Sequence, residues 1–120
     1  MSAFISLTEA VQMTTDYRNN RESILATAYQ GQNILAICET FDKAQVLQLL
    51  NETGCEKLRV YYGMDGNKKV HSILVGVDGD DKDILPSSSS LTSTEGDDEL
   101  ILEKAFRCPE TCPPDSELNT

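Results

Sequence analysis

Two alternating segments around a short turn constrain the fold of this chain more than any other feature. Apolar and polar residues alternate from Lys57 to Tyr62, and a second alternating run extends from Lys69 to Val77. Alternation with a period of two is typical of β-strands with one buried face. The tripeptide Asp-Gly-Asn at 65–67 consists of residues that tolerate the positive φ angles of tight turns. The sequence therefore predicts an antiparallel β-hairpin.

The length of the hairpin loop decides which side chains share a face, because a slip of one residue exchanges the two faces. A two-residue loop places Leu58, Val60 and Tyr62 on one face with His71, Ile73, Val75 and Val77. A three-residue loop places them with Val70, Ser72 and Leu74 instead. We expect the two-residue loop, since it collects more apolar surface on one side.

Under the expected register, the opposite face of the hairpin mixes polar and apolar side chains. Such a face is either half-covered by the rest of the chain or exposed as a contact surface for another protein. The candidate interaction patch consists of Arg59, Tyr61, Val70 and Leu74.

Helical patterns lie on the N-terminal side of the hairpin. Ser6 and Glu9 fit a capping box ahead of apolar residues at helical spacing, and further helical turns are predicted over 21–29. A central helix is predicted from Asp42 to Gly54, with a second capping box formed by Asp42 and Gln45. The short apolar run 34–38 predicts a strand.

Negative charge and proline are concentrated towards the C-terminus. Residues 78–120 carry a net charge of minus nine and all four prolines, whereas residues 1–77 carry minus one. We expect a compact α+β domain over residues 1–85, followed by an acidic low-complexity linker and a Cys- and Pro-containing tail over 86–120. Residues 100–106 are apolar enough to return as an edge strand, with a short helix as the alternative.

The predicted fold class is therefore α+β. It comprises N-terminal helices, a central helix and a small, mainly antiparallel sheet built on the hairpin, with an acidic Ser/Pro-rich C-terminal tail.

The overall net charge of minus ten disfavours nucleic acid and anionic membranes as partners, because both require clustered Lys and Arg. No apolar run approaches the ~20 residues that cross a bilayer. The first residues lack the basic and apolar regions of a secretory signal. We expect a cytoplasmic protein without a nucleic-acid or membrane partner.

The four cysteines are thiols by default in such a compartment. A tetrahedral zinc site could combine all of them, but zinc modules usually bring their ligands in close pairs, and Cys38 and Cys55 are far apart in the sequence. Cys108 and Cys112 are expected to be either free or joined by a disulfide. We assign no metal and no cofactor.

His71 is the one histidine and lies within a predicted strand. Nucleophilic catalysis would require a nucleophile beside it and a third group to orient the ring. The sequence contains no nucleophile-elbow motif and no glycine-rich phosphate loop. No catalytic residue is assigned, and we expect His71 to pack opposite Tyr62 or Val60.

Six segments of the chain carry a resemblance to other proteins. They are ISLTEA at 5–10, ETFD at 39–42, VYYGMD at 60–65, VGV at 75–77, CP at 108–109 and CPP at 112–114. Together they resemble a group of small uncharacterised bacterial proteins of unknown function, seen mainly in Bacteroidetes. The resemblance covers most of the chain and implies a bacterial origin and a single compact unit, but no activity, ligand or site residue.

These observations favour a non-enzymatic structural or protein–protein interaction module that forms a homo-oligomer or binds another protein. The alternative is a small ligand-binding domain or enzyme with a pocket between sheet and helices that involves His71 and Tyr62.

Overall fold

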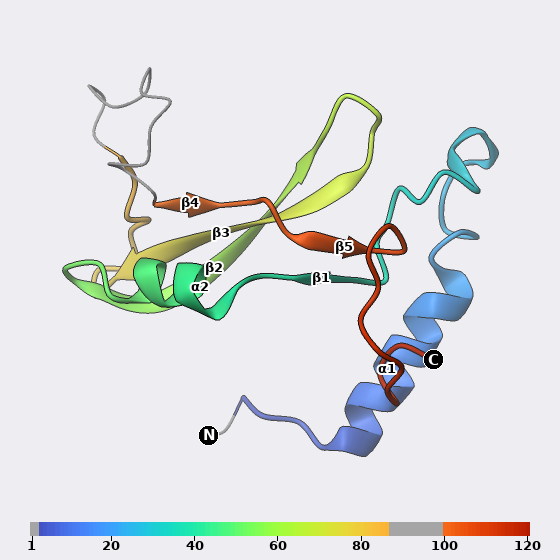
Figure 1. Cartoon of the computed structure of the whole chain (residues 1–120), viewed down its shortest axis with the longest axis horizontal. Coiled ribbons are helices and arrows are strands. Elements are labelled where there is room, and N and C mark those ends of the chain that lie inside the picture. The colour runs from blue at the N-terminus through green and yellow to red at the C-terminus, as the bar shows by residue number, and fades with distance from the viewer. Residues whose placement is uncertain (1–2, 87–99) are drawn as a thin grey trace. The chain divides into compact units, whose positions relative to one another are not determined.

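The computed structural model describes residues 3–86 and 100–120 of the chain (Figure 1). The described residues contain both α-helices and β-strands, which confirms the α+β class. They form two compact units. The terminal unit consists of Met1–Glu39 and Phe106–Thr120, and the hairpin unit consists of Thr40–Ala105. The boundary expected between residues 85 and 86 does not coincide with this division, because the C-terminal segment contributes strands to both units.

The terminal unit begins with helix α1, Leu7–Asn20. The backbone N–H of Glu9 donates to the hydroxyl of Ser6 over 3.0 Å, which confirms the predicted helix start. The further helical turns predicted over 21–29 are reduced to the short 3-10 helix η1, Thr27–Tyr29. The Asn20 carbonyl still accepts the Ile24 N–H over 3.1 Å, and the helical pattern ends after this bond.

The segment 33–36 of the terminal unit is irregular, although the sequence predicts a strand there. The strand β1 covers only Cys38–Thr40 and pairs with β5, Phe106–Cys108. Side chains satisfy the segment's backbone carbonyls in place of a ladder. Arg107 donates to Asn33 and Ile34 over 3.0 and 2.8 Å, Arg21 to Leu35 over 2.7 Å, and the Tyr17 hydroxyl to Ala36 over 2.5 Å.

The hairpin unit is built on a three-stranded sheet with the order β2-β3-β4. The strands are Cys55–Met64, Val70–Asp78 and Ile101–Leu102. Ile101 pairs antiparallel with Val75, so the strand predicted over residues 100–106 is confirmed for Ile101–Leu102. Residues 103–105 are irregular, and Phe106 belongs to β5 in the other sheet. Among the described residues, β3 is thus paired along both edges, and β2 along one.

The register of the β2–β3 hairpin corresponds to the three-residue loop, so the expected two-residue loop was wrong. Tyr61 pairs with Ile73, and the loop is closed by a bond of 3.0 Å from the Asp65 N–H to the Lys69 carbonyl. The positive φ of this loop, 66°, falls on Lys68. A type I turn followed by one left-handed residue is the usual form of a three-residue hairpin loop. The even-numbered residues 58–64 therefore share a face with the even-numbered residues 70–76.

Helix α2, Lys43–Leu50, lies against this even-numbered face at Gly76. The carbonyl oxygen of Leu49 is 3.2 Å from the position that a Cβ at Gly76 would occupy. The helix starts after Asp42 as predicted, but Asp42 makes no side-chain cap bond, so the second capping box was wrong. The helix also ends before Gly54, which instead takes a positive φ of 83° in the following turn.

We expect the substitution Gly76→Ala to destabilise the hairpin unit by about 1–3 kcal/mol, because overpacking forces backbone shifts. The added Cβ would lie 2.9 Å from the Cys55 sulfur and 3.2 Å from the Leu49 carbonyl oxygen. Urea unfolding measures the effect. Gly66→Ala is the matched control, since nothing lies within 4 Å of its Cβ position. Equal stability of the two variants would show that α2 does not approach β3 this closely.

Candidate functional site

The four residues of the candidate interaction patch do not form one surface. Arg59 and Tyr61 lie on the odd-numbered face of the hairpin, and Val70 and Leu74 lie on the even-numbered face. Leu74 is in addition buried, with 6% of its surface exposed. The patch was predicted from the two-residue loop, and the observed register separates its members.

Arg59 and Tyr61 are bound to the turn that follows β3. The guanidinium of Arg59 lies 2.6 Å from a carboxylate oxygen of Asp83 and 2.8 Å from one of Asp81. The Tyr61 hydroxyl donates to the other oxygen of Asp83. The bond from Tyr61, followed by the bond from Arg59, lowers the pKa of the Asp83 carboxyl, and the bond to Asp83 raises the pKa of the Tyr61 hydroxyl. Acidic residues of the chain itself therefore neutralise the basic side of the hairpin.

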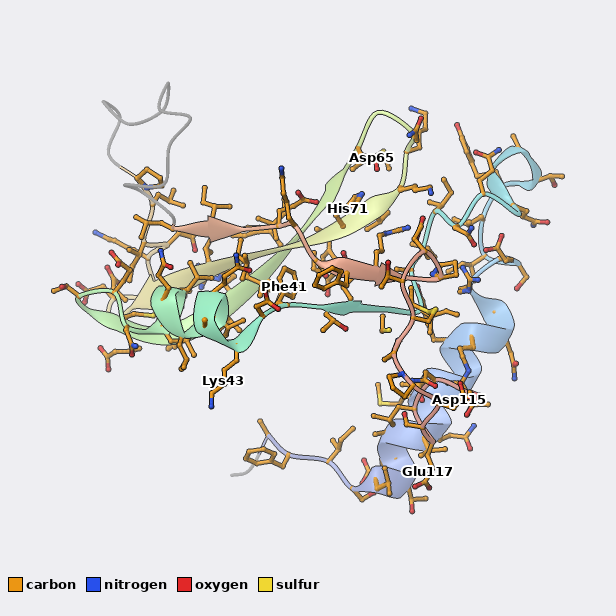
Figure 2. The ribbon with its side chains drawn as sticks, viewed as in Figure 1. Phe41, Lys43, Asp65, His71, Asp115 and Glu117 are labelled. Carbon is orange, nitrogen blue, oxygen red and sulfur yellow. A yellow bond between two sulfur atoms is a disulfide. The ribbon has the colours of Figure 1, made fainter. Side chains whose placement is uncertain are left out.

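His71 lies between two carboxylates at the hairpin end, those of Asp65 and Glu103. Figure 2 labels His71 and Asp65 at this end of the hairpin. Its Nε2 is 2.8 Å from an oxygen of Asp65, and its Nδ1 is 3.1 Å from an oxygen of Glu103. The bond from His71 lowers the pKa of the Asp65 carboxyl below its ordinary value of 3.8.

This environment does not support the expected role of His71 beside Tyr62. His71 pairs with Gly63, and Tyr62 pairs with Ser72 on the opposite face of the hairpin. The ring nitrogens are engaged by carboxylates that fasten the loop and the segment after β4. A general base needs a ring nitrogen within reach of a nucleophile's proton. The structure therefore shows His71 joining the hairpin loop, through Asp65, to the segment after β4, through Glu103.

One edge of β2 has no partner strand among residues 3–86 and 100–120, and we call it the free edge of β2. Asp65 is hydrogen-bonded to Lys69 across the hairpin. Backbone groups of successive strand residues point to opposite edges, so odd-numbered β2 residues bond β3. The N–H and C=O groups of even-numbered β2 residues therefore point away from β3. Gly76 obeys the same alternation, because its carbonyl accepts from Ile84 on the side away from β2. The residues with outward backbone groups are Leu58, Val60, Tyr62 and Met64.

The side chains of these same residues are exposed on the even-numbered face, and we call them the β2 stripe. Their exposed fractions are 43% for Leu58, 42% for Val60, 77% for Tyr62 and 63% for Met64. Apolar side chains beside unpaired strand backbone form a template for another chain. The alternation from Lys57 to Tyr62 predicted the strand and its apolar face, but not that this face would remain uncovered.

The cysteines divide into one bonded pair and two free thiols. Cys108 and Cys112 form a disulfide, and Cys38 and Cys55 are free. The disulfide uses two of the four thiols, so the four-cysteine zinc set is not available in this state. Within residues 3–86 and 100–120, no group of three or more His, Cys, Asp or Glu side chains is arranged to hold a metal ion.

A search of the described helices found none that combines the length and the apolar character needed to cross a membrane.

Comparisons with known proteins add no family to this description. No protein-family model matches the chain, and neither the curated proteins nor the solved structures contain a match. The resemblance to small Bacteroidetes proteins therefore stays a prediction.

The contact between Asp65 and His71 predicts that Asp65 contributes to the stability of the folded protein in a pH-dependent way. We expect Asp65→Asn to lower the thermal midpoint at pH 7, because it removes the carboxylate that contacts His71 and accepts the backbone N–H groups of Asn67 and Lys69. Since the folded-state pKa of Asp65 is lowered, its contribution is present above the unfolded value of about 3.9 and is lost as pH falls through the folded value. The difference between the variant and the unmodified protein should therefore shrink below about pH 4.

Thermal unfolding by circular dichroism from pH 7 to pH 2.5 measures this difference. Asp80→Asn is the control, because it removes the same charge from an exposed turn position. A difference that stays constant across this range would contradict the role assigned to Asp65.

Proposed function

We propose that this protein is a non-enzymatic interaction module that self-associates through the free edge of β2. The observation that carries the proposal is the coincidence, in the β2 stripe, of outward backbone groups and exposed apolar side chains. Backbone bonds from a docked strand supply affinity, and alternate side chains supply specificity. The β2 edge offers both unpaired backbone groups and exposed alternate side chains, as a strand-pairing interface requires.

The electrostatics of the hairpin unit support a protein partner over an anionic one. The basic side chains Lys57 and Arg59 are paired with Asp81 and Asp83. They are therefore occupied by the chain's own carboxylates, and the protein as a whole carries a net charge of minus ten. Nucleic acid and anionic lipid need available cations, whereas strand pairing does not.

The alternative, a ligand-binding domain or enzyme that uses His71 and Tyr62 together, has less support. Those residues lie on opposite faces of the hairpin, and both nitrogens of His71 contact carboxylates. We therefore propose no catalytic residue and no cofactor. The resemblance to a Bacteroidetes-type family is retained as a proposal about origin.

The proposal is tested by sedimentation velocity at micromolar concentrations. We expect a reversible monomer–dimer equilibrium that Tyr62→Lys shifts to monomer, because lysine on an edge strand opposes strand pairing. Tyr62 is 77% exposed, so the substitution should change the stability of the monomer by less than about 0.5 kcal/mol.

Ile24→Lys is the matched control, since Ile24 is a 69% exposed apolar residue of the terminal unit. It should leave the equilibrium unchanged. Only monomer at every concentration would remove the proposal of self-association, and equal weakening by both substitutions would remove its assignment to β2.

The cytoplasmic location expected from the sequence is a separate proposal, and the disulfide bears on it. Disulfides persist in oxidising compartments and are rare in the cytosol. The bond between Cys108 and Cys112 therefore favours an oxidising location, against the expectation from the N-terminal sequence.

Thiol trapping in intact cells distinguishes these locations. After rapid acid quenching and alkylation under denaturing conditions, an oxidising compartment should yield two modified cysteines, Cys38 and Cys55. Modification of all four cysteines would support the cytoplasm, and a Cys112→Ser variant provides the control for complete alkylation.

A further inference from the structure

We infer that the partner at the β2 edge is a second copy of this chain, paired with it through antiparallel β2 strands about a two-fold axis at Tyr61. This inference rests on the proposed function and specifies its geometry. The axis stands perpendicular to the sheet, because that operation places two identical edges side by side and antiparallel. The two sheets then join into one continuous sheet.

The backbone of β2 is suited to pairing with itself. Its unpaired donors and acceptors belong to even-numbered residues, so two copies match only when even-numbered residues stand opposite one another. The register shift between Cys55 and Lys57 limits the regular part of the strand to 57–64. A two-fold at Tyr61 lies near the middle of this regular part.

The apolar side chains select one register from those that the backbone allows. With the axis at Tyr61, Leu58 stands opposite Met64 of the second copy, and Val60 stands opposite Tyr62. Every member of the β2 stripe then meets another member, and all of them lie on one face of the joined sheet. An axis at Val60 would place Met64 opposite Glu56, and an axis at Tyr62 would place Leu58 opposite Gly66. Those registers leave part of the stripe without an apolar partner.

Charges on the odd-numbered face of β2 also favour the register with the axis at Tyr61. The axis at Tyr61 places Lys57 of each copy opposite Asp65 of the other, at each end of the paired segment. Lys57 is exposed and contacts one carboxylate oxygen of Asp81 at 3.4 Å, and its ammonium group has further donors for a second carboxylate. Opposite charges directly across two strands are favourable, and like charges are not. Arg59 stands opposite Gly63, which presents no side chain to oppose it.

The size of this edge predicts weak and reversible association. One strand from each copy covers less surface than the ~1,200–2,000 Å² of a stable interface. We therefore expect a dissociation constant of roughly 1–100 µM.

Cysteine cross-linking of the full-length chain tests the register. In a background of Cys38→Ser and Cys55→Ser, which keeps the 108–112 disulfide, single cysteines replace Val60, Tyr61 or Tyr62. Residues at position 61 form a non-hydrogen-bonded pair with Cα atoms about 4.5 Å apart, within the span of a disulfide. At positions 60 and 62, equivalent residues are displaced by two positions, or about 7 Å along the strand, which is beyond that span.

Under mild oxidation, Tyr61→Cys should form covalent dimers at least roughly tenfold faster than Val60→Cys or Tyr62→Cys. A second measurement does not depend on position 61. Leu58→Cys and Met64→Cys proteins should cross-link to each other when mixed, and neither should do so alone. Circular dichroism of each variant before oxidation confirms that it is folded.

Each result separates this inference from the proposed function. Fastest cross-linking at Val60→Cys or Tyr62→Cys would overturn the register while β2 pairing stands. A dimer in sedimentation with no cross-linking at any β2 position would overturn β2 pairing while self-association stands. A monomer in sedimentation would overturn both.

Discussion

The carboxylate of Asp65 is the contact on which the arrangement of the hairpin unit depends. One of its oxygens accepts the backbone N–H groups of Asn67 and Lys69 over 2.8 and 3.0 Å, and the other binds His71 over 2.8 Å. These bonds hold a loop in which Lys68 takes the left-handed conformation. The loop length decides whether even-numbered residues of β2 pair with even-numbered or with odd-numbered residues of β3. This pairing decides which side chains share a face.

The position of each strand in the sheet explains why β3 is buried while β2 is exposed. Val75 and Val77 of β3 retain 2% and 1% of their surface, since β3 has a pairing partner on each edge among the described residues. The apolar residues of β2 would be equally suited to a core. The β2 residues remain exposed because, among the described residues, β2 has a partner strand on one edge only. In addition, α2 comes close to the hairpin at Gly76, which pairs with Leu58 near the start of β2. The exposure of the β2 stripe therefore follows from topology.

Local patterns in the sequence predicted the elements whose causes are local. The Ser6–Glu9 helix start, the hairpin and the returning strand at Ile101–Leu102 all follow from neighbouring residues. The register did not, because the two-residue loop was expected for the apolar surface that it collects on one face, whereas the side chain of Asp65 stabilises a longer loop. The buried Arg107 was also beyond local patterns, since it donates to the Ile34 carbonyl 73 positions earlier.

The use of polar groups in both units points to the same chemistry. In the terminal unit, Arg107 and Tyr17 donate to backbone carbonyls that no ladder satisfies. In the hairpin unit, Arg59 and His71 hold carboxylates that close turns. Groups engaged in this way are expensive to release, because a buried or bonded donor must regain a partner when its own is lost. The groups that the hairpin unit leaves exposed on the even-numbered face of β2 are apolar side chains, and they lie beside strand backbone that has no partner among the described residues. These are the groups that the proposed strand pairing would use.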